Sequence, residues 1–106
     1  MYPQIHRRQL PIHFRALASP TRLTILERLA EQGEMSVKEL AASLRVSQPR
    51  VSWHLAMLRR GGVVRTRKDG RQVHCSLDLE GIRLHQAALW DLLNGNKRTI
   101  EVRDGA

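Results

Sequence analysis

Apolar residues recur at helical spacing through the first 60 positions of the chain. The clearest stripe predicts a helix that Ser19 caps, that Pro20 begins and that Gly33 ends. Its apolar face is expected to consist of Leu23, Leu26, Leu29 and Ala30. A shorter helix is expected before it, over residues 9–18.

Two further helices are predicted on either side of a short turn. Ser36 and Glu39 have the spacing of a capping box at the start of the first, which buries an apolar face. After Arg45 and Val46, Ser47 caps the second helix, over about residues 47–60, and Gly61-Gly62 ends it. The inner faces are Val37, Leu40, Ala41 and Leu44 in the first helix and Val51, Leu55 and Leu58 in the second.

From Val63 the pattern changes to alternation, which is typical of strands. Two short strands over about residues 63–77 are joined at Asp69-Gly70, a strong hairpin signal. A last helix is expected over residues 81–94, with Gly95 after its end. The inward-facing strand residues are expected to be Val64, Thr66, Val73, Cys75 and Leu77.

Together these elements describe a mainly α-helical fold with a β-hairpin wing, the winged helix-turn-helix. A chain of 106 residues favours one domain. We expect that domain to span residues 9–94. Residues 1–8 are expected to be a flexible tail and residues 95–106 a frayed one.

The positive charge is concentrated in one segment. Of the chain's net charge of +8, residues 45–71 carry +7, with eight basic residues against Asp69 alone. A solvated basic face is one explanation of such a run. A polyanion partner is favoured, because basic side chains that neutralise phosphates release counterions.

Trp53 is unusual because it points away from the core of its own helix. At 100° per residue, it lies at about 200° from Val51, almost opposite the inner face. In a major groove an indole packs on thymine methyls or sugars, and its N–H donates to a base edge or a phosphate. The alternatives are that Trp53 folds back on the wing or on a dimer mate, or that it is the docking residue of a winged-helix protein–protein interaction module.

Three stretches carry a family resemblance: "LASPTRLTILERLAE", "MSVKELAASLRVSQPRVSWHLAMLRRGGVV" and "RKDGRQVHCSL". They resemble the ArsR/SmtB family of bacterial winged-helix repressors over about residues 17–77. The resemblance implies a homodimer joined by the first and last helices, acting as an autorepressor on an imperfect palindrome in double-stranded DNA. It also implies that Gln48, Ser52 and His54 contact DNA. Pro49 departs from the Ser or Thr usual in the family, which removes one hydroxyl contact.

The other expected DNA contacts come from the helix and wing themselves. The recognition helix is placed in the major groove, and the wing on the backbone or in the minor groove. The complete set of candidate DNA-binding residues is Ser47, Gln48, Arg50, Ser52, Trp53, His54, Arg59, Arg60, Arg67, Lys68 and Arg71.

The family's metal-sensing motifs are absent. Where members that sense thiophilic metals have Cys-Val-Cys, this chain has Ser36-Val37-Lys38, which cannot supply two thiolates. On the last helix only His85 is available, and its spacing to the nearby acids does not match the zinc-sensing version. No metal or cofactor is therefore expected. A nitrogen-rich site using His6 and His13, redox chemistry at Cys75, an organic ligand and control without any ligand stay open.

The sequence excludes or disfavours several classes of protein. No Ser/His/Asp order, metal-hydrolase spacing or Gly-rich phosphate loop supports an enzyme. No apolar run approaches the roughly 20 residues of a membrane span, and the basic N-terminus lacks the apolar run of a signal peptide. A single cysteine fits a reducing, cytoplasmic setting.

Overall fold

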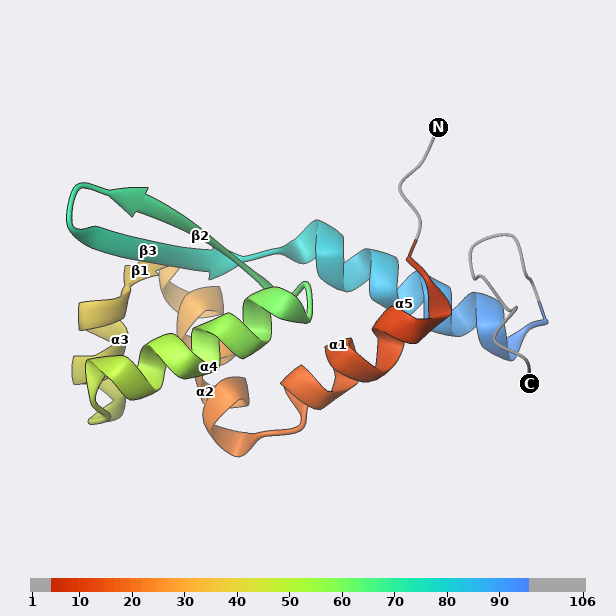
Figure 1. The fold of residues 1–106 in the computed structure, drawn as a ribbon, viewed down its shortest axis with the longest axis horizontal. Coiled ribbons are helices and arrows are strands. Elements are labelled where there is room, and N and C mark those ends of the chain that lie inside the picture. The colour runs from red at the N-terminus through yellow and green to blue at the C-terminus, as the bar shows by residue number, and fades with distance from the viewer. Residues whose placement is uncertain (1–4, 96–106) are drawn as a thin grey trace.

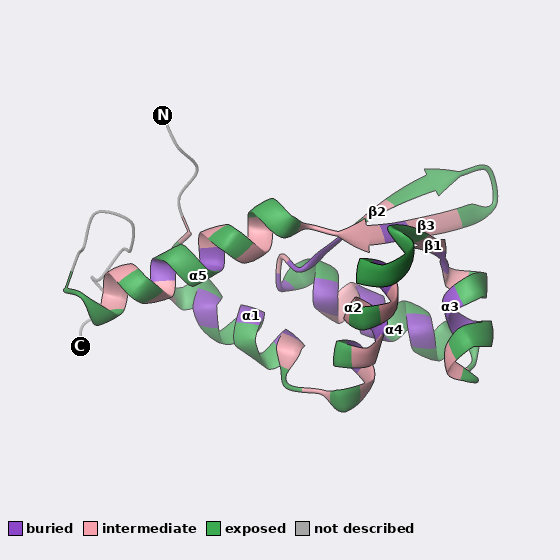
Figure 2. Cartoon of the chain, turned by 180° about the vertical axis from the view of Figure 1, so that it is seen from behind, coloured by how far each residue is buried: buried purple, intermediate pink, exposed green. Residues whose placement is uncertain are grey.

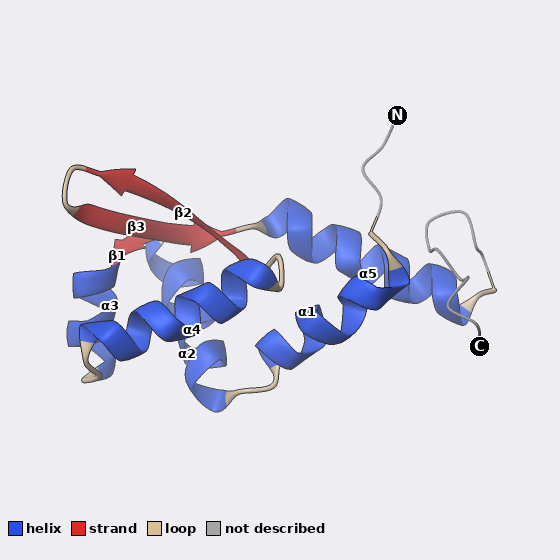
Figure 3. Cartoon of the chain, viewed as in Figure 1, coloured by secondary structure: helices blue, strands red, loops and turns tan. Residues whose placement is uncertain are grey.

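The computed structural model describes residues 5–95, which form five α-helices, a 3₁₀ turn and a three-stranded sheet (Figures 1 and 3). The expected winged helix-turn-helix is confirmed. In chain order the elements are η1 (Arg7–Gln9), α1 (Leu10–Leu17), α2 (Pro20–Gln32), β1 (Glu34–Ser36), α3 (Val37–Leu44), α4 (Gln48–Arg60), β2 (Val64–Asp69), β3 (Gln72–Leu77) and α5 (Leu79–Leu93).

The turn between α3 and α4 is fixed by local hydrogen bonds. Arg45 adopts the left-handed conformation with φ 58°, and the Val46 amide donates to the Ala41 carbonyl at 3.1 Å. The Ser47 hydroxyl then accepts from the Arg50 amide at 3.3 Å and caps α4. The predicted capping box at Ser36 is also present. The turn therefore sets α4 at a defined angle across α3.

The wing is an antiparallel hairpin of β2 and β3 whose pairing runs from Val64 opposite Leu77 to Asp69 opposite Gln72. The short strand β1 adds to the other edge of β3, giving the order β1-β3-β2. The pattern along the chain did not predict β1, which is only three residues long. It ties the base of the wing to the start of α3 (Figure 1).

The main core lies where α2, α3, α4 and the sheet meet, and buried segments converge there (Figure 2). The predicted inner face of α4 is buried, with Val51, Leu55 and Leu58 no more than 3% exposed. The fully buried side chains also include Ile25, Leu29, Leu40, Val63, Val64 and Cys75.

The helices α1 and α5 form the end of the molecule opposite the wing tip (Figure 1). A second, small core holds them together, in which Leu10 and Ala88 are buried and Ile5 and Leu92 pack against them. Trp90 and Leu93, at 65% and 66%, are among the most exposed hydrophobic side chains of the described residues.

The buried face of α2 differs from the expected one. Arg22, Ile25 and Leu29 are buried, whereas Leu23 is 52% exposed and Ala30 is exposed. The helix is rotated so that a basic residue, rather than Leu23, points toward the core. Hydrogen bonds from Arg22 to backbone carbonyls compensate the burial of its guanidinium.

Other boundaries differ by a few residues. The last helix begins two residues earlier than expected, because the Asp78 carboxylate accepts from the Gly81 amide at 2.9 Å and caps it. Residues 7–9, partly assigned to the N-terminal tail, form a 3₁₀ turn. The remaining tail predictions, for residues 1–4 and 96–106, lie outside the described residues.

Candidate nucleic-acid interface

The outer face of α4 carries an exposed aromatic residue among polar and basic ones. Trp53 is 57% exposed, as its position opposite Val51 predicted. Around it Gln48, Arg50 and Ser52 are also exposed, and no acidic residue lies in the first turn. The amide groups at the N-terminus of α4 add their positive dipole end to this surface. The face therefore suits a polyanion with an apolar component.

His54 lies elsewhere than expected. The family resemblance implied that it contacts DNA, but it is only 7% exposed. Its Nδ1 lies 3.1 Å from a terminal nitrogen of Arg22, and burial, followed by the charges of Arg22 and Arg50, lowers its pKa. The side chain is thus neutral at neutral pH and belongs mostly to the interior.

Two arginines of the wing are held by carboxylates. Arg67 donates to both oxygens of Glu34 at 2.8 and 3.0 Å, and this hydrogen bonding lowers the pKa of Glu34 and raises that of Arg67. Arg65 pairs with Asp78 at 3.2 Å. Arg67 was expected to be available for phosphates. In the structure its charge is already compensated from β1, a pairing that the sequence did not indicate.

Other basic groups of the wing are available. Within residues 5–95, Lys68 and Arg71 are exposed and form no ion pair. Arg71 lines a polar cleft of about 240 Å³ with Lys38 of α3, a residue that sequence reasoning left out. The cleft also contains Gln48 and Ser52 of α4. It brings the start of α4, the start of α3 and the wing tip together around one basic opening.

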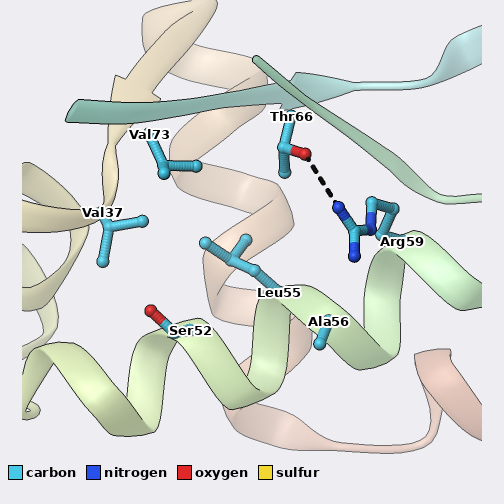
Figure 4. Close-up of a pocket in the computed structure, with 7 residues that line it drawn as sticks. All are labelled: Val37, Ser52, Leu55, Ala56, Arg59, Thr66 and Val73. Atoms are coloured by element: carbon cyan, nitrogen blue, oxygen red, sulfur yellow. Dashed lines mark hydrogen bonds between the residues drawn. The ribbon is translucent and has the colours of Figure 1, made fainter. Parts of the chain in front are cut away.

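A second hollow, of about 210 Å³, continues between α4 and the wing (Figure 4). Arg59 lies at one end of it and donates to the Thr66 hydroxyl at 3.3 Å, so the end of α4 is tied to β2 (Figure 4). Ser52 lines both spaces, whereas Leu55 and Ala56 give this one an apolar floor. Arg60, next in the chain, is exposed.

The candidate sensor residues do not assemble into a metal site. His6 is exposed on the 3₁₀ turn, whereas His13 is buried and stacks on His85, with ring centroids 4.0 Å apart. Among residues 5–95 no group of three or more His, Cys, Asp or Glu side chains is placed to hold a metal ion. In the same range no helix is long and apolar enough to span a bilayer.

Cys75 is a packed core residue. It is 1% exposed, its thiol donates to the Met35 carbonyl at 3.1 Å, and burial raises its pKa to about 11. A buried thiol that stays protonated is a poor nucleophile. The expectation of a small inward-facing side chain at this strand position is confirmed.

The sequence profile described as "Bacterial regulatory protein, arsR family" matches residues 19–66, which run from the cap of α2 into the wing. The arsenic resistance transcriptional regulator of Pseudomonas putida is 35% identical over 102 residues, covering 93% of this chain and 80% of the relative. The chain belongs to the ArsR family.

Two further comparisons agree. The arsenical resistance operon repressor of Escherichia coli is 48% identical over 69 residues, covering 64% of this chain and 59% of the repressor. A homodimeric winged helix-turn-helix DNA-binding domain from Mycobacterium bovis superimposes with a TM-score of 0.66 at 29% identity, covering 92% of this chain and 94% of the domain. The chain is therefore a DNA-binding transcriptional regulator and not an enzyme.

Proposed function

We propose that the protein is a dimeric repressor of the bacterial cytoplasm that binds an imperfect palindrome near its own gene. The observation that carries this proposal is the outer face of α4, where Trp53 stands exposed on the helix whose start shares a basic cleft with Arg71 of the wing. Sequencing the fragments that the purified protein selects from a random DNA pool tests it. We expect two inverted half-sites about one helical turn apart, and a selected pool without any common sequence would contradict the proposal.

The proposed contacts fall into two groups. The outer face of α4 reads base edges in the major groove, and Trp53 packs on bases or sugars there. Basic residues at the end of α4 and on the wing hold phosphates without reading sequence. The first group is Ser47, Gln48, Arg50, Ser52 and Trp53, and the second is Arg59, Arg60, Lys68 and Arg71 with Lys38 added. His54 is too buried for a broad contact with bases.

The pairing of Arg67 with Glu34 leads to a prediction for a Glu34 variant. Glu34→Gln should release Arg67, so that both operator and non-specific DNA bind more tightly and the salt dependence becomes steeper. Arg71→Ala, by contrast, should flatten the slope by about one unit for each phosphate that the side chain neutralises. Both are measured by fluorescence anisotropy titrations at several salt concentrations.

Glu31→Gln is the matched control, because it removes one negative charge from an exposed residue of α2 that forms no ion pair within residues 5–95. Equal gains in Glu34→Gln and Glu31→Gln would show that only net charge matters and that Arg67 stays off the DNA. Arg67→Ala should change the slope less than Arg71→Ala.

The dimer is proposed to form through α1 and α5. Ile12, Phe14 and Trp90 are exposed on these helices, and a hollow of about 500 Å³ between them is lined by Leu10, Pro11, Phe14, Leu89 and Leu92 together with Arg7 and Arg8. So much apolar surface at one end of a small chain favours self-association.

We predict a dimer at micromolar concentration. Trp90→Glu should shift it toward monomer and weaken operator binding, since a monomer engages one half-site without the second. Sedimentation velocity measures the first effect and anisotropy the second. Leu23→Glu, a similarly exposed apolar position on α2, is the control. A wild-type monomer that binds operator tightly would contradict this interface.

The effector is proposed to be something other than a thiophilic metal. Ser36 and Lys38 stand where two thiolates would be needed, and the single cysteine is buried. An organic ligand in the dimer interface and control by concentration alone both fit this chain. A protein partner docking on Trp53 is the remaining alternative for α4. It is distinguished from DNA by salt, because an aromatic protein contact lacks the steep dependence of phosphate contacts.

A further inference from the structure

Arg22 of α2 is a buried cation without a carboxylate partner among residues 5–95. It is 7% exposed, and its Nε donates to the Ala16 carbonyl at 2.8 Å. One terminal nitrogen donates to the Arg15 carbonyl at 3.4 Å, and the other lies 3.1 Å from Nδ1 of His54. The guanidinium therefore joins the end of α1 to the middle of α4 through three acceptors at once.

The same guanidinium lies beneath Trp53. Its central carbon is 5.7 Å from the centre of the indole ring, within the range of a cation–π contact. The His54 ring meets the indole edge-on, with centroids 5.0 Å apart and planes at 69°. An exposed side chain on a helix surface ordinarily samples several rotamers. Here two groups of the interior contact the indole, while the residue as a whole stays 57% exposed.

The contact also fixes the protonation of His54. A guanidinium only donates hydrogen bonds, so Nδ1 of His54 must accept, and the ring proton of the neutral side chain is on Nε2. Burial and two neighbouring arginines lower the pKa of His54, so this neutral form persists at neutral pH.

We propose that Arg22 is a positioning residue for DNA recognition: it holds the Trp53 indole in the orientation that enters the groove, and it keeps His54, which packs edge-on against the indole, in the neutral Nε2–H form. This rests on the proposed function, in which α4 binds DNA. Because no carboxylate neutralises Arg22 among residues 5–95, its charge also adds to the positive potential of α4. Arg22 itself stays beneath the surface and reads no base.

Lysine cannot replace Arg22 in this role. Its single ammonium cannot reach three acceptors on two helices at once, whereas the planar fork of arginine does. Arg22→Lys therefore keeps the charge and changes the geometry. We expect it to weaken operator binding about 3- to 30-fold, because the cation–π contact, weak at an exposed site, becomes stronger once the indole is desolvated in the groove. Non-specific binding should change less than about twofold, because the phosphate contacts remain.

A double-mutant cycle separates positioning from plain structural support. In a Trp53→Ala background, Arg22→Lys should cost less than about twofold in operator affinity, because the group it positions is gone. Arg28→Lys is the matched control on the same helix, since within the described residues Arg28 bonds the exposed Ser43 hydroxyl and pairs weakly with Glu27. Additive losses, with the same cost in both backgrounds, would overturn the proposal.

Two measurements on DNA-free protein that keeps Arg22 test the proposal even if the Arg22→Lys variant folds poorly. In a Trp90→Phe background, where Trp53 is the one tryptophan of the sequence and is excited selectively over tyrosine, time-resolved anisotropy should show an indole that moves with the backbone. Imidazole ¹⁵N shifts should show His54 as the Nε2–H tautomer. A freely rotating indole or the Nδ1–H tautomer would overturn the proposal whether or not DNA binds. Absence of any operator, with both results as expected, would instead overturn only the proposed function.

Discussion

Replacing Trp53 with alanine is expected to lower operator affinity about 5- to 150-fold, because one base-edge or methyl contact contributes about 1–3 kcal/mol. The fold should survive. Trp53 is 57% exposed, and Val51, Leu55 and Leu58 fill the core on the opposite side of α4, so truncation opens no buried cavity. Removing the indole from above Arg22 should cost about 1 kcal/mol or less in stability.

Affinity for operator and for a scrambled sequence, together with thermal unfolding, measures these effects. Non-specific binding should fall much less than operator binding, because exposed basic groups such as Arg60 and Arg71 stay in place. Operator DNA should quench the fluorescence of the wild type clearly and that of the variant, in which Trp90 remains, only weakly. Leu23→Ala, an exposed apolar truncation on α2, is the control for affinity.

Two outcomes would contradict this interpretation of Trp53. A loss of several kcal/mol in unfolding free energy would make it a packing residue. Normal operator binding would remove it from the groove and favour a protein partner. In either case the fold and family assignment of the chain would stand, because they do not depend on this side chain.

The helix-turn-helix and wing could be predicted because their signals are local. Ser36 with Glu39 and Ser47 with Pro49 mark two helix starts, and Asp69-Gly70 marks the hairpin, each within a few residues. The exposure of Trp53 followed from helical periodicity alone, once the apolar side of α4 was known.

Long-range pairs could not be predicted. Glu34 and Arg67 meet only because β1 joins the sheet beside β3, and a three-residue strand has too short a pattern to detect. His13 meets His85 only when α5 packs on α1. These pairs decide which basic groups of the wing are free and which histidines are buried, so the location of the candidate site could be predicted but the partners of its side chains could not.

Arg22 shows how periodicity misleads. Two stripes that share Leu29 are available on α2, one through Leu23 and Ala30 and one through Arg22 and Ile25, so the second requires a buried arginine. Apolar periodicity alone favours the first. The protein adopts the second because carbonyls at the end of α1 and the His54 ring accept from the guanidinium. Tertiary hydrogen bonds thus outweigh the local preference.

The second large effect expected is acid sensitivity well above the pH at which carboxylates titrate. The rings of His13 and His85 stack at 4.0 Å with planes 6° apart, at the junction of α1, α5 and the turn after α4. Nδ1 of His13 lies 2.6 Å from the Gly61 carbonyl, and Nδ1 of His85 lies 2.7 Å from the Gly81 carbonyl. Carbonyls only accept, so Nδ1 is the donor in both rings.

The junction has no room to relax around a new charge. Nε2 of His13 is buried without a hydrogen-bond partner among residues 5–95, and a methyl group at Gly62 would lie 2.7 Å from the His85 ring. Protonation would bury a cation whose facing groups are the Phe14 ring and a second histidine. Burial lowers the pKa of His13, against the hydrogen bond to Gly61, and the charge of His85 lowers it further. Burial likewise lowers the pKa of His54.

The direction of the change in unfolding free energy with pH follows from the number of protons that the folded and unfolded chains bind. The unfolded chain binds protons at its histidines near pH 6.5, whereas His13 and His54 in the folded protein bind theirs only at a lower pH. Their contribution to the unfolding free energy is therefore complete above pH 6.5 and is lost as pH falls through the lowered folded pKa values. Each unit by which a pKa is lowered contributes about 1.4 kcal/mol. Urea unfolding between pH 7.5 and 5.0 measures the loss before carboxylates, with ordinary values near 4.5, take part.

Replacing His13 with leucine should make this pH dependence shallower, because one histidine with a lowered pKa is removed. This holds whatever the variant loses in unfolding free energy at pH 7.5. The slope of unfolding free energy against pH is thus the readout that isolates protonation from packing. His6→Gln, at an exposed histidine beside the 3₁₀ turn, is the matched control and should leave the slope as in the wild type. Stability that stays constant down to pH 5.0, or equal slopes in the two variants, would mean that His13 takes up its proton in the folded protein as readily as in the unfolded chain.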